Sequence, residues 1–254
     1  MKRILLCLLA GILLLITAGC GDKTPPNTVH SPEDVQDKVI GAISGSPSAR
    51  LADELGTLRT YSSGADLMAG LLTGAVDCAI MENTSAIDLA EATQGVKILS
   101  EPLLEYELSF AVAKENAELK NAINSALGVL SSNGILNGLR DKYFGGKPFT
   151  YVPPENIAPH PGTLTVAVSP DDWPFSYVDK NGDYSGLNVQ VALAVCDQLG
   201  VGLEIAGYET GELITSVWYG KVSIALGWLP GDVHDRVNLS DPYASSSHVI
   251  MVRN

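Results

Sequence analysis

Short apolar runs alternate with amphipathic segments along most of the chain, from about residue 31 to residue 252. Apolar runs rich in β-branched residues favour strands, and apolar positions recurring every three or four residues favour helices. In the first half we predict strands at 39–44, 57–61, 76–81 and 96–100, and helices at 31–38, 45–56, 63–74 and 83–94. This alternation is typical of βαβ units, whose strands form a mostly parallel sheet.

The second half of the chain repeats this alternation after a different middle section. A long extended stretch is predicted at 104–116, and it is followed by helices at 117–130 and 133–144. The segment 145–161 is rich in Gly and Pro and has no periodicity, which predicts a linker. Beyond it we predict strands at 163–169, 201–208 and 221–228, a hairpin at 175–186, helices at 187–200 and 211–220, and a final extended piece at 236–252. The fold class is therefore α/β.

The first residues of the chain have a separate pattern. In segment 1–19, two basic residues precede an apolar run that is too short to cross a bilayer comfortably. Small residues then precede Cys20, as in a bacterial lipoprotein signal, although Thr17 stands where Leu is usual. Cleavage after Gly19 would leave Cys20 as a lipidated N-terminus on a polar tether, 20–30. The alternative is a plain anchor helix.

Composition narrows the classes of partner. A chain of 254 residues suits one large domain or two lobes. Its hydrophobic content of 46% and charged content of 18% argue against disorder. The net charge of −13 argues against nucleic acid as a partner, because neutralising phosphates requires a basic face. The same acidity disfavours direct docking on anionic lipid.

The familiar motifs of catalysis and metal binding are missing from the sequence. Asp179, Asn181 and Asp183 alternate as in a calcium loop, but Tyr184 replaces the required Gly and Gln190 the required Glu, which favours a plain turn. The four histidines do not lie at metal-ligand spacing. The sequence has no nucleophile elbow, Walker loop or dinucleotide fingerprint. We therefore predict neither catalytic residues nor a cofactor or metal.

Two cysteines remain once Cys7 and Cys20 are assigned to the signal and the lipid. Cys78 and Cys196 each lie within an apolar segment. They are either two buried free thiols or a disulfide, and the sequence leaves this open.

Two local features indicate a binding cleft. Ser44, Ser46 and Ser48 stand where a predicted strand leads into a helix start, a position that suits anions and polar ligands in a parallel sheet. The alternative for these serines is helix capping. The stretch "DDWPF" also follows a strand, and its Asp172, Trp173 and Phe175 would either line a pocket or pack on the core.

These segments together resemble the type 2 periplasmic solute-binding proteins, the family 3 receptors of amino-acid ABC transporters. In the second half the resemblance rests on "LTVAVSPDDWPFSYVDKNGDYSGLNVQVALAVCDQLGVGLEI", "LITSVWYGKVSIALGW" and "RVNLSDPYASSSHVIMVR". In the first half it rests on "SPEDVQDKVIGAISGS", "YSSGADLMAGLLTGAVDCAIMENTSA" and "YELSFAVAKENAELKNAINSALGVLSSNGILNGLRDKYFGG". It implies a two-lobed fold that closes on a small ligand.

The order of the two halves differs from that of the family. In the family the half containing "LTVAVSP" comes first, so this chain resembles a circular permutant of the two-lobed fold. The resemblance implies the following division: signal 1–19, tether 20–30, lobe 2 at 31–104, a return segment 105–144 completing lobe 1, linker 145–161, and lobe 1 at 162–254 ending in a hinge strand.

The resemblance also implies a ligand site. The family's amine-binding Asp maps onto Glu82, and its stacking aromatic lies near Trp173. Trp228 takes the position of a family Met, while the family's carboxylate-clamping Arg falls on Val233 or Asp232. Without that clamp, an ordinary α-amino acid would leave a buried carboxylate unpaired. We therefore predict a cationic or amine-bearing ligand held by Glu82 between Trp173 and Trp228, the alternative being a clamp from Arg50 or Arg236.

The function implied is that of an extracytoplasmic solute-binding protein, tethered to a bacterial membrane by its lipid, which delivers a small polar ligand to an ABC permease. No bond would be made or broken. Two alternatives remain: an accessory protein or receptor that binds another periplasmic protein, and a dehydratase-like enzyme built on the same fold.

Overall fold

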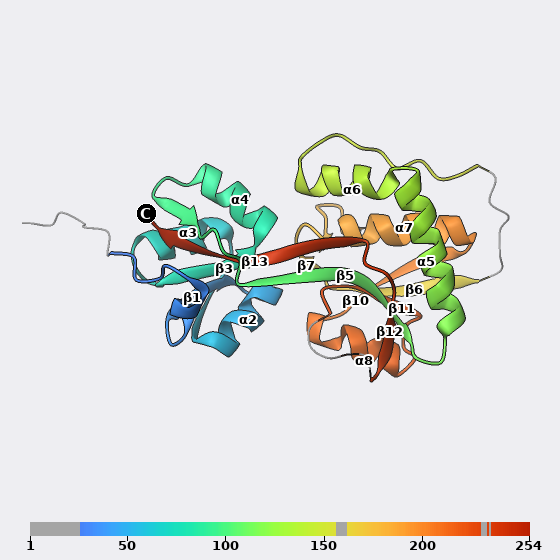
Figure 1. The fold of residues 1–254 in the computed structure, drawn as a ribbon, viewed down its shortest axis with the longest axis horizontal. Helices are drawn as coiled ribbons and strands as arrows, with labels where there is room; N and C mark the ends of the chain where they lie inside the picture. The colour runs from blue at the N-terminus through green and yellow to red at the C-terminus, as the bar shows by residue number, and fades with distance from the viewer. Residues whose placement is uncertain (1–25, 156–161, 230–232, 234) are drawn as a thin grey trace, which may run out of the picture.

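Two lobes joined by two long strands make up the protein (Figure 1). The computed structural model describes residues 26–155, 162–229, 233 and 235–254. The joining strands are β5 (Leu104–Ala113) and β13 (Ala244–Arg253), which run antiparallel from one lobe into the other. Their pairing extends from Leu104 opposite His248 to Leu108 opposite Ala244.

The lobe that contains the described N-terminal end is built on a parallel sheet. Its strands are β1 (Val39–Ile43), β2 (Thr57–Tyr61) and β3 (Cys78–Glu82), with β4 (Val96–Ile98) paired to β13. Its helices are α2 (Pro47–Leu55), α3 (Gly64–Leu72) and α4 (Asn83–Ala92). Each helix connects two strands of the sheet, as the alternating pattern predicts.

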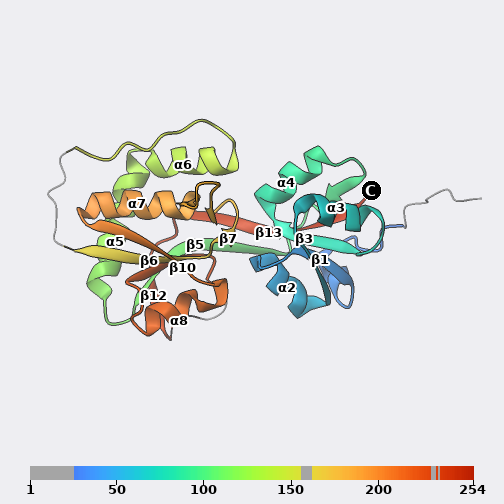
Figure 2. The same cartoon turned by 180° about the vertical axis from the view of Figure 1, so that it is seen from behind.

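The other lobe has a second parallel set of strands and most of the helical mass (Figure 2). Its strands are β6 (Thr163–Val168), β10 (Gly202–Gly207), β11 (Ile224–Gly227) and β12 (Val237–Leu239). Its helices are α5 (Ala117–Ser132), α6 (Ile135–Phe144), α7 (Leu187–Leu199) and α8 (Leu213–Trp218), preceded by the 3₁₀ turn η2 (Thr210–Glu212). A small sheet of β7 (Asp171–Asp172), β8 (Ser176–Val178) and β9 (Tyr184–Ser185) lies beside α7.

One continuous sheet links the two lobes. Its strand order is β10-β6-β11-β5-β13-β3-β1-β2, with β12 on β5 and β4 on β13. The segments before and after residues 145–161 therefore share a sheet and do not form two independent globules. The chain has the two-lobed type 2 periplasmic-binding-protein fold.

Two predicted helices are shorter than expected. The predicted helix 31–38 is only the 3₁₀ turn η1 (Pro32–Val35), because Asp37 adopts a φ of 60° and turns the chain into β1. The predicted helix 211–220 is divided between η2 and α8. Leu213 and Val217 are buried residues of α8, so this part of the segment is helical, as predicted.

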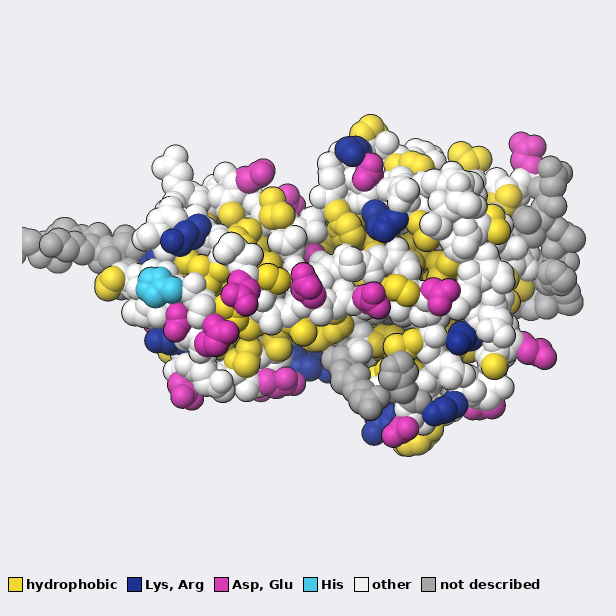
Figure 3. All heavy atoms as spheres, in the orientation of Figure 1, with side chains coloured by type: hydrophobic (Ala, Val, Ile, Leu, Met, Phe, Trp, Pro, Cys, Tyr) yellow, Lys and Arg dark blue, Asp and Glu magenta, His cyan; other side chains and the backbone are white. Residues whose placement is uncertain are grey.

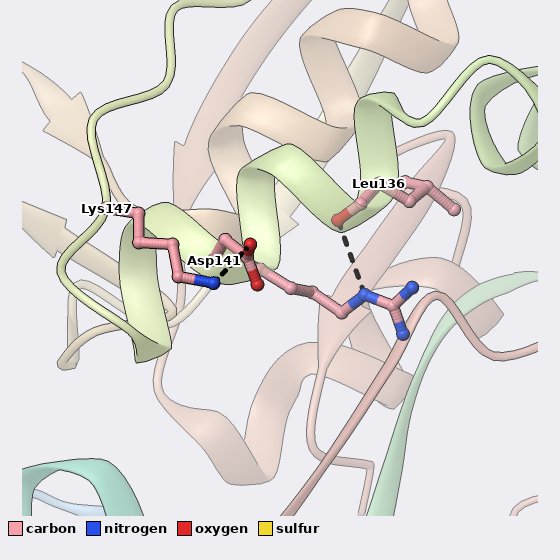
Figure 4. A network of polar contacts seen from close by, with 4 residues as sticks. Leu136, Asp141 and Lys147 are labelled. Carbon is pink, nitrogen blue, oxygen red and sulfur yellow. Dashed lines mark hydrogen bonds and ion pairs between the residues drawn. The ribbon is translucent and has the colours of Figure 1, made fainter.

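The segment after α6 is tied to its lobe by several contacts. The Lys147 ammonium pairs with the Asp141 carboxylate at 2.9 Å (Figure 4). Phe149 packs so closely on Gly138 that a Cβ there would meet its ring. The Tyr151 hydroxyl donates to Asp197 Oδ2 on α7 at 3.0 Å. The described part of the predicted linker thus lies along the lobe.

The two described ends of the chain lie together. The buried Arg253 guanidinium donates to the carbonyl oxygens of Leu71 and Val76 at 2.7 and 2.6 Å. It also donates to the Pro26 carbonyl at 3.4 Å. Val29, at the end of the predicted tether, is fully buried in the same lobe. The C-terminal strand is therefore fastened beside the first described residues.

Cys78 and Cys196 are both buried and free. This settles the alternative that the sequence left open, because no disulfide joins them. Within the described residues, no helix is long and apolar enough to cross a membrane. The predicted signal and Cys20 lie outside the described residues.

Candidate functional site

A cavity of about 310 Å³ lies where the two lobes meet the joining strands. The first lobe contributes Ile43, Ser46, Pro47, Ser48, Gly64, Ile80, Met81, Glu82, Ser85, Asp88 and Leu89. The second lobe contributes Asp171, Asp172 and Trp173, and the joining strand β13 contributes His248. Residues far apart in the sequence therefore form one site.

The start of α2 forms one wall of the cavity. Ser46 is the N-cap, and its Oγ accepts from the Ala49 N–H at 3.2 Å. Ser48 is buried, and its hydroxyl is hydrogen-bonded to Nδ1 of His248 at 3.0 Å. Ser44 is exposed and is not among the lining residues. Ser46 therefore caps the helix, and Ser46 and Ser48 both line the cavity.

Glu82 sits at the end of β3 and is only 6% exposed. Its Oε2 accepts from the Ser85 N–H at 3.1 Å, which makes it the N-cap of α4. Its Oε1 accepts from the hydroxyls of Thr84 and Ser246. These donors fix the carboxylate in position at the cavity wall, and the positive end of the α4 dipole favours its negative charge.

Asp172 faces the same cavity from the other lobe. The residue is 8% exposed, and no hydrogen bond to its carboxyl group is found within the described part of the chain. Burial, and secondly the charge of Glu82, raise the pKa of Asp172 to about 8. Both causes disfavour the ionised form of Asp172. A cation placed between the two carboxyl groups would offset both effects, because it attracts the negative charge of each.

His248 is a site residue that the sequence did not indicate. Its ring stacks on Tyr106 with centroids 5.0 Å apart and makes a T-shaped contact with Trp228, with centroids 4.8 Å apart. Desolvation lowers the pKa of His248 to about 4, so the imidazole is neutral at pH 7. A lone histidine in a strand carries no signal of its own. Its relevance follows from β13 pairing with β3, which sets His248 opposite Glu82.

The three predicted aromatic residues occupy different places. Trp173 lines the cavity at its rim, is 52% exposed and lies 4.6 Å from the Tyr177 ring. Phe175 is fully buried in the core, in edge contact with Tyr106 and Phe144. Trp228 is half-buried behind the cavity, packed on Tyr106 and His248. Of the three, only Trp173 is among the lining residues.

The charge of the cavity is one-sided. Four of its lining residues are acidic, namely Glu82, Asp88, Asp171 and Asp172, and none is Lys or Arg. Among described residues, the two arginines considered as replacement clamps lie elsewhere. The Arg236 guanidinium stands over the Trp218 ring at 5.0 Å, and Arg50 reaches Gly211 of the other lobe. Acidic side chains also follow the joining strands on the outer face (Figure 3).

No cluster of His, Cys, Asp and Glu in the described part of the chain has the arrangement of a metal site. The cavity therefore combines carboxyl groups, a neutral imidazole and an apolar wall. Such a lining suits a small organic cation with an apolar portion.

Comparison with known proteins shows that one segment of the chain matches a family model. Residues 164–254 match the model described as bacterial extracellular solute-binding proteins, family 3. This segment of the chain is therefore similar to that family.

Particular relatives share about half of the chain. The probable amino-acid-binding protein YxeM of Bacillus subtilis is 27% identical over 130 residues, covering 48% of this chain and 49% of that protein. The L-cystine-binding protein TcyJ of Escherichia coli is 25% identical over 141 residues, covering 54% and 51%. The chain thus spans about half the length of the curated relatives it matches.

Similarity to solved structures extends over more of the chain. The phosphate-binding protein of a phosphate ABC transporter from Streptococcus pneumoniae TIGR4 is similar with a TM-score of 0.48 and 15% identity. The similarity covers 86% of this chain and 89% of that one.

Proposed function

We propose that this protein captures a small ligand between its two lobes and delivers it to an ABC importer. The ligand bears an amine, either as a free amine or as the amine of an amino-acid side chain. The observation that supports this most directly is Asp172, a buried carboxyl group without a hydrogen bond in the described structure, which faces a second carboxyl group across the cleft. The match of residues 164–254 to the solute-binding family model supports the transport role.

The electrostatics favour an ammonium group over a carboxylate. A ligand carboxylate would enter a cavity that is lined by four acidic residues, with no Lys or Arg among the lining residues. Burying such a carboxylate unpaired costs several kcal/mol. An ammonium ion instead meets Glu82 from one lobe and Asp172 from the other, so binding it would draw the lobes together. Trp173 at the rim can add a cation–π contact of about 0.5–2 kcal/mol.

A thermal-shift and calorimetric screen tests the ligand class. We expect n-butylamine, phenethylamine or cadaverine to raise the Tm, and L-alanine, L-glutamate and L-glutamine to leave it unchanged. Stabilisation by these three amino acids but not by the amines would overturn the proposal.

Charge-neutral variants test the two carboxyl groups. Glu82→Gln should weaken the best amine by about tenfold to a hundredfold, because a charge-assisted hydrogen bond contributes about 1.5–3 kcal/mol. Glu91→Gln makes the same charge change on the outer side of α4, where Glu91 is exposed, and should leave the affinity unchanged. If these two variants bind the amine with equal affinity, Glu82 does not contribute to ligand binding.

Proton release gives an independent signature of a cationic ligand. The pKa of Asp172 is raised to about 8 in the unliganded protein, so the carboxyl group is mostly protonated at pH 7. A bound ammonium would favour its ionised form. Calorimetry at pH 7 in buffers of different ionisation enthalpy should therefore report protons released on amine binding, and affinity should rise between pH 6.5 and 8. Binding without proton release would contradict this role of Asp172.

We further propose that Cys20 carries a lipid that holds the protein on the extracytoplasmic side of a membrane. The sequence pattern of segment 1–19 supports this. Cys20→Ser should move the protein from the membrane fraction to the soluble fraction, and labelling with a fatty-acid analogue should be lost. Labelling of the Ser variant would contradict the assignment.

The gene order of the lobes is proposed to be a circular permutation of the family order, with the division predicted above. The contact of Arg253 with Pro26 supports this, because it brings the two described ends of the chain to one place. Permutation is tolerated where the new ends fall in an exposed connection and the old ends are close.

A further inference from the structure

One nitrogen of His248 lacks a partner although the ring is almost completely buried. The residue is 1% exposed, and Nδ1 is hydrogen-bonded to the Ser48 hydroxyl at 3.0 Å. Nε2 has no hydrogen-bond partner among the described residues. Buried polar atoms are nearly always paired, so an orphan in a residue that lines a cavity points to a partner supplied by the ligand.

The surroundings of the ring fix its orientation. Tyr106 stacks against one face of the imidazole, and the edge contact with Trp228 restricts it further. The bond to Ser48 prevents the ring from turning over without losing that contact. Nε2 is therefore presented by packing from both lobes and the hinge, which is how preorganised binding groups are held.

The neighbour of His248 across the sheet is Glu82. The two residues are directly opposite each other in the antiparallel pairing of β13 and β3, so their side chains leave the sheet on the same face. Ser246 lies two residues earlier on that face and donates to Glu82. The imidazole and the carboxylate thus border the same part of the cavity.

We propose that Nε2 of His248 is a third acceptor for the ligand's ammonium group, beside the carboxyl groups of Glu82 and Asp172, so that the cleft selects primary amines. This inference rests on the proposed function. A primary ammonium has three N–H donors, one for each acceptor, whereas N-methylation removes donors one at a time. In this arrangement the neutral imidazole carries its proton on Nδ1, and this N–H group donates a hydrogen bond to the Ser48 hydroxyl.

Two substitutions separate the two ring nitrogens. His248→Asn keeps a polar group near the position of Nδ1 and removes the one at Nε2. His248→Gln reaches the position of Nε2 and gives up the bond to Ser48. Ser247→Ala is the matched control, because the adjacent residue of the strand points to the opposite face.

The measurement is the affinity of each protein for n-butylamine, phenethylamine and cadaverine and for their N-methylated forms, by calorimetry. We expect wild type and Ser247→Ala to prefer the primary amine by about tenfold. His248→Asn should bind it about tenfold more weakly and lose most of that preference, while His248→Gln should retain it. If His248→Asn matches wild type, this inference is overturned and the proposed function stands.

A measurement on the unmodified protein does not depend on the variants' folding. ¹⁵N NMR of His248 in the presence of the bound amine should show a proton on Nδ1 and a lone pair on Nε2. A proton on Nε2 in the complex would overturn the inference even if amines bind. If no amine of the panel binds to wild type, the proposed function fails and this inference fails with it.

Discussion

At the scale of single residues, the acidic pair across the cleft has consequences for stability as well as binding. Glu82 accepts hydrogen bonds from three donors, whereas no hydrogen bond to the Asp172 carboxyl group is found in the described structure. This difference explains why burial raises the pKa of Asp172 so strongly. A residue kept in such a position without compensation is a typical sign of a binding site.

The first prediction concerns the pH dependence of stability. Because the pKa of Asp172 is raised from 3.8 to about 8, its contribution to stability is complete below pH 4 and declines as the pH rises to about 8. Asp172→Asn should therefore raise the Tm of the unliganded protein, and the gain should grow between pH 6.5 and 8. Over that interval the difference in unfolding free energy should increase by up to about 2 kcal/mol.

The interval is chosen because His248 changes stability in the opposite direction at lower pH. Burial lowers the pKa of His248 from 6.5 to about 4, so its contribution is present above pH 6.5 and lost as the pH falls towards 4. Thermal melts of wild type and Asp172→Asn at several pH values check the prediction. A gain that stays constant from pH 6.5 to 8 would contradict the raised pKa of Asp172.

At the scale of elements, the start of α2 shows how local sequence positions a site. Ser46 precedes Pro47, a residue suited to the first helical position, and its hydroxyl satisfies the N–H of Ala49. The cap sets where the helix begins, and this places Ser48 in the next turn beside His248. Local capping chemistry and the geometry of the cavity are therefore linked.

The second prediction tests that link. Ser46→Ala should lower the unfolding free energy by about 1 kcal/mol, because the Ala49 N–H loses its acceptor. Ser44→Ala is the matched control, since Ser44 is exposed and no side-chain hydrogen bond is found for it in the described structure, and it should change stability by less than about 0.5 kcal/mol. Urea unfolding of both variants measures this, and equal stabilities would show that the cap is unimportant.

At the scale of the whole molecule, the continuous sheet explains how the two halves of the chain form one two-lobed structure. β5 and β13 come from different halves of the chain, yet they pair with each other and carry the strands of both lobes on their outer edges. Each lobe has its own buried core, and β5 and β13 run between the two lobes. This arrangement favours hinge motion around the cavity.

The third prediction concerns the proposed permutation. A variant that joins Asn254 to Asn27 by a short flexible linker and opens the chain between Gly146 and Gly162 should fold to the same structure. Loop-closure entropy changes slowly with loop length, so its stability should lie within about 2 kcal/mol of the parent. Circular dichroism, thermal melting and amine affinity measure the outcome. A variant that folds but does not bind the amines bound by the parent would contradict the proposed equivalence.

The sequence by itself determined the βαβ alternation, the long extended segment 104–116 and the helix starts, because these depend on local periodicity and caps. It also marked Asp172 and Trp173, which follow a strand, and the family resemblance pointed to Glu82; all three line the cavity. Only the tertiary structure decided that Phe175 belongs to the core and that Trp228 stands behind the cavity, since either place suits an aromatic side chain. It alone brought His248 to Glu82 and Asp172, because strand pairing across the hinge joins residues that no local pattern connects.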